Sequence, residues 1–131
     1  SFFWIKARLL MPDLSSSKFF TSASTITSTT AGASADVVYT VPANFSSIVR
    51  YLLLSNGTNS SKKAYVQFYH ASNGVYHYLA NGLSMSGHSI TSLSSFGSLS
   101  LFEGDKIVAF KEAGMDLDIS LSAEEYYDPN R

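Results

Sequence analysis

The histidines are the first side chains in this sequence that could support chemistry. Three are present, at His70, His77 and His88. His70 and His77 flank a predicted hairpin turn at Asn73-Gly74, so they could approach each other across the hairpin. A metal site would need a third ligand, and the spacing does not bring His88 to the other two. In an aromatic hairpin a packed or edge histidine is more common, so we predict no metal and no cofactor.

Four carboxylates form a second candidate group near two predicted turns. They are Glu103, Asp105, Asp116 and Asp118. Paired carboxylates can hold calcium or act as acid and base, but these lack the spacing of an EF-hand loop. An outward Asp-x-Asp on a strand is more often a solvated face that discourages edge aggregation. Calcium at the acidic turn stays open as an alternative, and we predict that catalysis is absent.

Other kinds of chemistry have no motif in the chain. There is no cysteine, which excludes a thiolate nucleophile and a thiolate zinc site. No serine lies in Gly-x-Ser-x-Gly, and the glycines form no phosphate-binding motif. The net charge is −1 and the pI about 6.2, whereas nucleic-acid binders usually carry a basic stripe. The sequence therefore predicts a protein that is not an enzyme and binds no nucleic acid.

The tyrosines are the one cluster that favours a binding role. The predicted hairpin strands 64–70 and 75–79 place Val66, Phe68, Val75, His77 and Leu79 toward the core. The opposite face then carries Tyr65, Tyr69, Tyr76 and Tyr78. Such a face is either a second core layer or an interface, because tyrosine combines apolar area with a polar tip. Interface contact and glycan stacking both remain open for these four residues.

The elements that carry these residues all read as short strands between turns. Further strands are predicted at 19–30, 36–41, 47–54, 106–111 and 115–123, the third of them central and buried on both faces. In the last, Leu117, Ile119 and Leu121 face inward while Asp116 and Asp118 face outward. No helical period stands out. We predict an all-β protein, an antiparallel β-sandwich or jelly roll, with an N-terminal arm and first extended segments at 1–35 and the sandwich body at 36–131.

The N-terminal arm is apolar but carries two cations. Its large apolar residues are Phe2, Phe3, Trp4, Leu9 and Leu10, with Lys6 and Arg8 between them. The segment is too short to span a membrane, and its charges lie inside the apolar run, unlike those of a signal peptide. It could form an edge strand of its own domain or dock into a partner. We predict docking, with Phe2, Phe3, Trp4, Arg8, Leu9 and Leu10 as contact residues.

A resemblance adds to these patterns. Three segments carry it: Tyr39-Thr40-Val41-Pro42-Ala43-Asn44, then Val49 to Asn56, then Leu101-Phe102-Glu103-Gly104-Asp105-Lys106-Ile107, followed by a final alternating strand ending in Ser122-Ala123-Glu124. Together they resemble small β-sandwich virion proteins of tailed bacteriophages. The resemblance covers roughly residues 37–124, and its motifs constrain turns rather than chemistry.

That resemblance implies a function without an active site. It points to a capsid decoration (cement) protein located in the virion, with the major capsid protein or other virion proteins as partners. It also implies a homo-oligomer, with a trimer favoured. The alternative is a neck, tail or fibre module with possible carbohydrate binding. The low content of charged residues, 15%, suits a surface that packs against neighbours.

Overall fold

The computed structural model describes residues 13–93 and 98–129, with side chains from residue 18 onward. Nine strands lie in this part of the chain, joined by turns and one short 3-10 turn at Gly32–Ser34. The strands are β1 (Asp13–Ile26), β2 (Asp36–Thr40), β3 (Phe45–Asn56), β4 (Lys62–His70), β5 (Val75–Met85), β6 (Ser89–Ser92), β7 (Leu99–Phe102), β8 (Lys106–Lys111) and β9 (Leu117–Tyr127).

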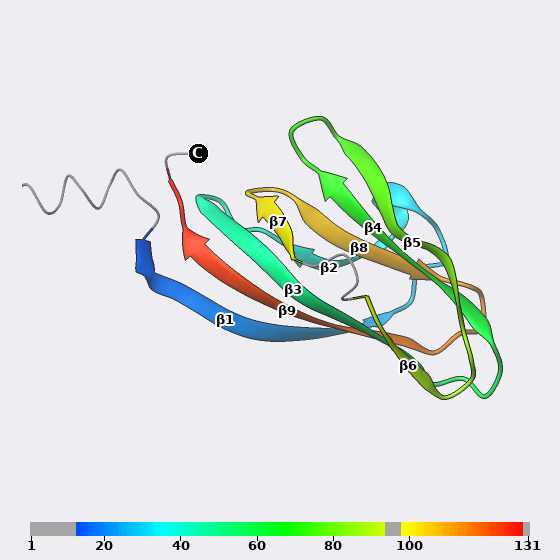
Figure 1. Ribbon diagram of the computed structural model, residues 1–131. Helices are drawn as coiled ribbons and strands as arrows, with labels where there is room; N and C mark the ends of the chain where they lie inside the picture. The colour runs from blue at the N-terminus through cyan, green and yellow to red at the C-terminus, as the bar shows by residue number, and fades with distance from the viewer. Residues whose placement is uncertain (1–12, 94–97, 130–131) are drawn as a thin grey trace, which may run out of the picture.

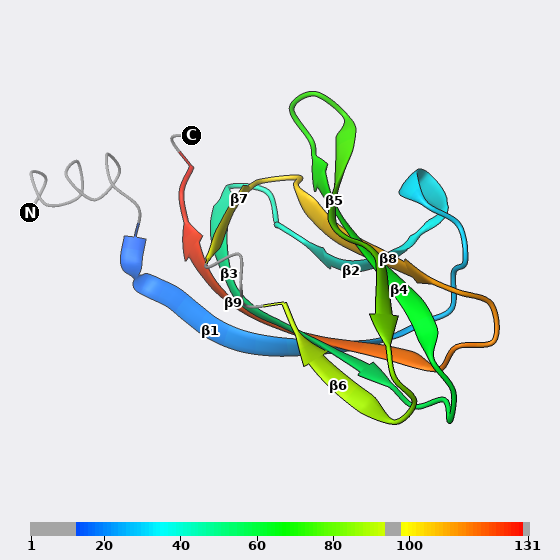
Figure 2. The ribbon, with the colours of Figure 1, turned by 45° about the vertical axis from the view of Figure 1, so that its right-hand side comes forward.

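The strands form two sheets that pack face to face. The first sheet has the order β1-β9-β3, and the far edge of β3 pairs with both β6 and β7. The second sheet has the order β2-β8-β4-β5. Figures 1 and 2 show the second sheet lying across the first, with β1 at the outer edge of the first sheet. Every pairing is antiparallel, which confirms the predicted all-β antiparallel sandwich.

The core between the sheets follows the alternation predicted for the last strand. Leu117, Ile119 and Leu121 are fully buried at 0% exposure, while Asp116 and Asp118 are exposed. β9 lies between β1 and β3, so its inward residues meet neighbours on both sides. The strand continues to Tyr127, beyond the predicted end at residue 123. Residues 124–131 have the composition of a polar and aromatic tail, but Glu125 continues the inward alternation of β9, at 5% exposure.

The β4–β5 hairpin has the turn predicted at Asn73-Gly74, but Asn81-Gly82, a second pair whose residue types fit a tight hairpin turn, does not form one. Its loop spans residues 71–74, and Gly74 adopts the left-handed region at φ 70°. Asn81-Gly82, in contrast, lies inside β5 rather than in a turn. The register slips there, because Ala64 pairs with Leu83 whereas Tyr65 pairs with Asn81. Gly82, at φ 75°, is the extra residue of a β-bulge, the other structure that commonly requires a positive φ.

Asn56 has a different role from a simple turn former. It ends β3, is 1% exposed, and its side-chain amide donates to the carbonyls of Ser60, Met85 and Ser86 at 3.1–3.2 Å. Its side-chain oxygen accepts from the backbone N–H of Thr58 at 3.0 Å. One buried amide thus satisfies the backbone of two separate loops at this end of the sandwich.

The prediction that β3 is buried on both faces is wrong. Its inward residues Val49, Leu52 and Leu54 are fully buried, but on the other face Tyr51 is 39% exposed. A register shift between Val49 and Tyr51 places Arg50 at a bulge. Among the described residues, no second layer covers this face. The apolar run therefore predicted the central position of β3 in its sheet correctly, but not burial on both faces.

The first 35 residues contribute a strand to the sandwich. β1 pairs with β9 from Lys18 to Ile26 without a break, so this extended segment belongs to the first sheet. The predicted anchor residues of the arm, Phe2, Phe3, Trp4, Arg8, Leu9 and Leu10, lie outside the described residues.

Candidate functional site

The four predicted tyrosines do lie together on one surface. They occupy the outer side of the second sheet, which we call the tyrosine face: Tyr65 and Tyr69 on β4, and Tyr76 and Tyr78 on β5. The opposite side of these strands supplies Ala64, Val66 and Ala80 to the core. The predicted aromatic face and the inward positions of Val66, Phe68 and Leu79 are therefore confirmed. The prediction that Val75 and His77 face the core is wrong, because both are exposed near the hairpin tip.

Ring contacts hold the tyrosine face together in two groups. Tyr65 stacks on Phe110 of β8 with ring centroids 4.4 Å apart and planes 5° from parallel. Tyr78 meets the same phenylalanine edge-on at 6.4 Å, and Tyr69 packs on Tyr76 at 4.6 Å. These contacts hold the rings in fixed orientations, which lowers the entropy lost when a partner binds.

One side of the tyrosine face packs into a small second core, and the other side is exposed to solvent. Tyr65 and Tyr76 pack on a small buried cluster of Ala35, Val108 and Phe110. Tyr78 is 45% exposed, and the amino group of Lys106 lies 5.5 Å from the centroid of Tyr69. Two of the rings thus close a minor core, as one predicted alternative had it, and the exposed ring of Tyr78 leaves the interface alternative a prediction.

The acidic residues do not form one site. Asp105 follows the β7–β8 turn and is 2% exposed, while Asp116 and Asp118 are exposed at the opposite end of β8. Asp105 accepts backbone hydrogen bonds from Ala71 and Phe102, each at 3.0 Å. Its carboxylate thereby joins the β4–β5 loop to the β7–β8 turn. Within the described ranges, no three histidine or acidic residues gather where they could hold a metal ion.

His70 lies between Asp105 and Ser72, in the order of a hydrolytic triad, but its Nδ1 makes no hydrogen bond with another described residue. Its Nδ1 lies 3.7 Å from Asp105 Oδ1, and its Nε2 lies 2.9 Å from Ser72 Oγ. However, the backbone N–H groups of Asn73 and Gly74 already donate to the His70 carbonyl. Acyl transfer needs such donors for the developing oxyanion. This loop uses them for its own fold, so the geometry favours a structural role.

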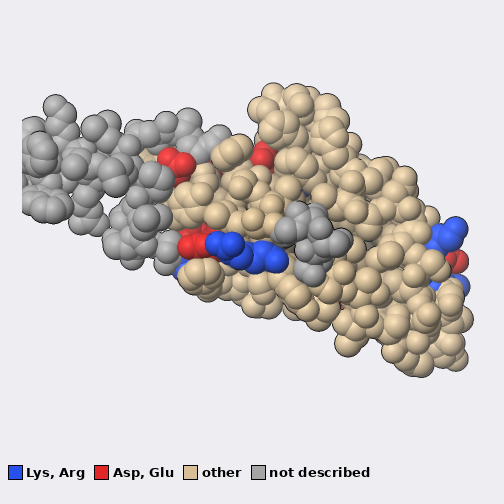
Figure 3. Space-filling view, viewed as in Figure 1, with Lys and Arg blue, Asp and Glu red and all other residues tan. Residues whose placement is uncertain are grey.

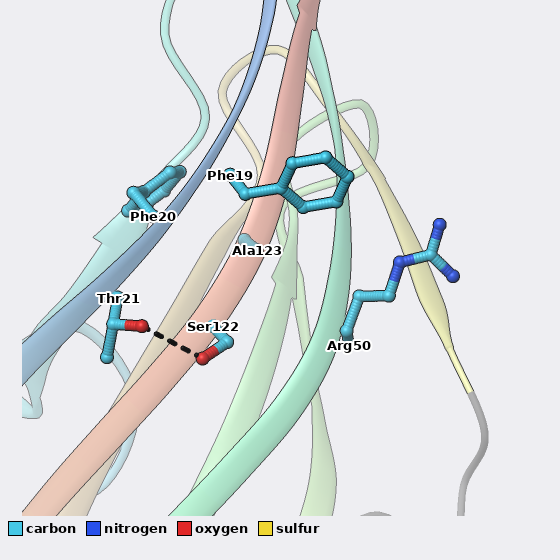
Figure 4. A pocket seen from close by; sticks show the side chains of 6 residues that line it. All are labelled: Phe19, Phe20, Thr21, Arg50, Ser122 and Ala123. Atoms are coloured by element: carbon cyan, nitrogen blue, oxygen red, sulfur yellow. Dashed lines mark hydrogen bonds between the residues drawn. The ribbon is translucent and has the colours of Figure 1, made fainter.

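A second surface, which the sequence analysis did not identify, is the outer side of the first sheet. Two shallow pockets of about 310 and 390 Å³ follow one another along β1 and β9. We call them together the hydroxyl trough. The lining side chains that point outward are Phe19, Thr21, Ala23, Thr25, Arg50, Ser55, Asp118, Ser120 and Ser122. Figure 4 shows the Phe19 ring lying across β9 toward the β3 strand that carries Arg50.

Charge is sparse around the trough. Arg50 pairs with Glu124 of β9 at 3.1 Å, and Asp118 is the one carboxylate among the described residues that line the trough. Figure 3 shows charged side chains gathered mainly toward the two ends of the molecule, with a broad uncharged surface between them. The low content of charged residues in the sequence thus corresponds to a largely uncharged surface on the face that Figure 3 shows.

One buried polar pair lies between the sheets. The Tyr39 hydroxyl donates to Glu125 Oε2 at 2.6 Å, and both residues are buried, at 8% and 5% exposure. Burial and the bond to Glu125 raise the pKa of Tyr39 above its ordinary value of 10.0. Lys18 approaches the other carboxylate oxygen at 3.6 Å. This cluster joins β1 and β9 of the first sheet to β2 of the second.

Comparison with known proteins adds no family. No protein-family model matches the sequence, and no curated protein matches it. Among the described residues, no helix has the length and hydrophobicity to cross a membrane.

Proposed function

We propose that this chain is a non-enzymatic structural protein of a bacteriophage virion, a capsid decoration protein that acts by packing against neighbouring subunits. Its partners are the major capsid protein or other virion proteins, and further copies of itself. The proposal rests on the short motifs that resemble such proteins. It is supported by a sandwich whose surface is poor in charge and rich in fixed aromatic rings.

The observation that carries the proposal is the tyrosine face. Tyrosine is enriched in the buried centres of protein interfaces, where a rigid ring adds contact area at a low entropic cost. Tyr78 is 45% exposed and Val37, across the same sheet, is 51% exposed. Such side chains on one flat surface offer a contact to a large partner rather than a pocket for a small molecule.

The arm supplies a second proposed contact. Three aromatic side chains can bury several hundred Å², at roughly 150–250 Å² each. At about 25 cal/mol per Å² this gives on the order of 10 kcal/mol gross, before ordering and association costs. A decoration protein that binds an assembled shell at many sites stabilises it by mass action.

Binding to particles that lack the protein tests the proposal. We expect deletion of residues 1–12 to leave the melting temperature close to that of the full chain and to abolish co-sedimentation with the particles. Tyr78→Ala should weaken binding about tenfold or more, as expected for loss of an interface aromatic. Tyr51→Ala is the matched control, because Tyr51 is similarly exposed, at 39%, but lies on the opposite sheet.

Two results would argue against this function. If the truncated chain unfolds, the arm belongs to the core and is not an anchor. If the full chain does not sediment with the particles, the decoration role is wrong.

The alternative is a neck, tail or fibre module that binds carbohydrate. The exposed ring of Tyr78 is the observation that favours it, because sugars stack on aromatic rings. Copy number separates the two functions: a decoration protein is present in hundreds of copies per virion and a tail module in a handful.

A further inference from the structure

The hydroxyl trough runs along the outer side of β9, between β1 and β3. The residues that line the first pocket are Phe19, Phe20, Thr21, Arg50, Ser122 and Ala123, and those that line the second are Ala23, Ser24, Thr25, Ser55, Asp118 and Ser120. Residues 19 to 25 of an extended strand span about 20 Å, at roughly 3.3 Å per residue. The trough is therefore long and shallow, a shape that suits a segment of a chain molecule.

Small hydroxyl side chains form the floor of the trough. Thr21 Oγ1 and Ser122 Oγ share a hydrogen bond of 3.1 Å, and Thr25 donates to Asp118 at 2.8 Å. The structure gives no hydrogen bond to another described residue for the hydroxyls of Ser55 and Ser120. Each hydroxyl can donate once and accept twice, so most of the hydrogen-bonding capacity of the floor faces solvent.

The first pocket is largely apolar, whereas the hydroxyls and Asp118 of the second pocket disfavour an occupant that is apolar along its whole length. A protein segment rich in Phe or Leu would cover the hydroxyls without returning their hydrogen bonds, and buried polar groups that lose their partners are costly. A nucleic acid is disfavoured as well. Arg50 is the one cation of the trough and already pairs with Glu124 at 3.1 Å, whereas phosphate backbones require several cations.

Charge also selects among polar ligands. The trough and its rim carry Arg50, Glu124 and Asp118, two carboxylates against one guanidinium. An anionic ligand would be repelled on balance. Phe19, at 73% exposure, is the most exposed large apolar side chain of the described residues, and it lies at one end of this polar floor.

We propose that the hydroxyl trough binds a neutral oligosaccharide chain. Sugar hydroxyls donate to and accept from the Ser and Thr side chains, Asp118 accepts from a sugar hydroxyl, and Arg50 donates to one. The Phe19 ring packs on the C–H face of a sugar ring. The trough and the tyrosine face lie on opposite sheets of the sandwich, so one molecule can bind a shell through one face and a glycan through the other.

NMR titration of the isolated, isotope-labelled protein tests the site without any virion. The probes are maltohexaose, cellohexaose and chitohexaose, each titrated separately to millimolar concentration. We expect saturable shifts with at least one of them, confined to amides of β1, β9 and the adjoining part of β3. No saturable shift with any of the three would overturn the proposal. Shifts centred on β4 and β5 would also overturn it, because they would place the ligand on the tyrosine face.

Two variants establish which surface is used. Phe19→Ala should weaken saccharide binding about five- to tenfold, the loss of one ring contact. Val75→Ala is the control: Val75 is an exposed apolar side chain, at 43%, on β5 of the opposite sheet, and its loss should leave saccharide affinity unchanged. If both variants bind equally well, Phe19 does not contact the ligand and the assigned geometry is wrong. The inference does not rest on the virion role, since particle binding and saccharide binding are measured separately.

Discussion

Removal of one hydroxyl, in Tyr39→Phe, should destabilise the sandwich more than the loss of a typical hydrogen bond. The Tyr39 hydroxyl donates to Glu125 at 2.6 Å, and Glu125 is 5% exposed. Hydrogen bonds to charged groups contribute about 1.5–3 kcal/mol. In the variant, the one remaining partner of the buried Glu125 carboxylate among the described residues is Lys18, at 3.6 Å. Because the Lys18 side chain is 65% exposed, this ion pair offsets little of the lost hydrogen bond. We expect a loss of about 2 kcal/mol in the free energy of unfolding, or about 5–10 °C in melting temperature for a domain of this size.

A double-mutant cycle with Glu125→Gln measures the interaction itself. If the pair is coupled, the double variant should lose about 1–2 kcal/mol less than the sum of the single variants. Tyr51→Phe is the control, because Tyr51 is 39% exposed, and should change stability by less than about 0.5 kcal/mol. Urea unfolding followed by circular dichroism supplies all the values. Additive losses, or equal losses in Tyr39→Phe and Tyr51→Phe, would refute the reasoning.

The same pair predicts a dependence on alkaline pH. Because the folded state raises the pKa of Tyr39 above 10.0, its contribution to stability is present below pH 10 and lost as the pH rises further. Above the ordinary pKa the wild-type protein should lose about 1.4 kcal/mol per pH unit from this group. Tyr39→Phe should lack that component, so the stability difference between the two proteins should shrink above pH 10.

Four further substitutions test the register of β9, an acid-sensitive contact and the bulge in β5. Ile119→Ala removes a fully buried side chain and should lower the free energy of unfolding by about 2–5 kcal/mol. In the same urea experiment, Asp118→Ala should lower it by less than about 1 kcal/mol. Equal losses would contradict the register of β9. The backbone N–H of Thr27, above all, lowers the pKa of Asp36 from its ordinary value of 3.8, so the stability that Asp36 contributes is present above that pH and lost as the pH falls below it. The advantage of the wild-type protein over Asp36→Asn should therefore decline in acid, and a pH-independent difference would contradict this. Gly82→Ala should lower the free energy of unfolding by about 1–2 kcal/mol, because alanine is strained at a positive φ. Steric clash should add little, since the nearest atom to an added Cβ, on Tyr65, is 3.6 Å away. An unchanged melting temperature would contradict the bulge.

Local periodicity was sufficient to predict the strands that have one solvent-exposed face and one buried face. β8 begins and ends at the predicted residues 106 and 111, and β9 shows the predicted alternation, because burial in a two-layer sandwich repeats every second residue. The same rule placed the four tyrosines on one side of β4 and β5. It succeeded there even though two bulges interrupt the pairing of these strands.

Features that depend on partners distant in sequence were not predictable. Alternation places Glu125 on the inward face of β9, but the sequence did not reveal what would stabilise a buried carboxylate there, because the Tyr39 hydroxyl that donates to it is 86 positions away. Asn81-Gly82 signals a positive φ equally well in a turn or a bulge, and only the pairing with β4 decides between them. The hydroxyl trough was missed because Ser- and Thr-rich segments read as weak strands. Its residues come from β1, β3 and β9, and the sheet topology alone brings these strands together.

The copy number of this chain in purified virions tests the central claim most directly. Quantitative mass spectrometry against the major capsid protein would give it. The decoration role predicts hundreds of copies per particle, in a simple ratio to the capsid subunits. A handful of copies would indicate a neck, tail or fibre position instead, and absence of the chain from the particles would contradict the virion role altogether.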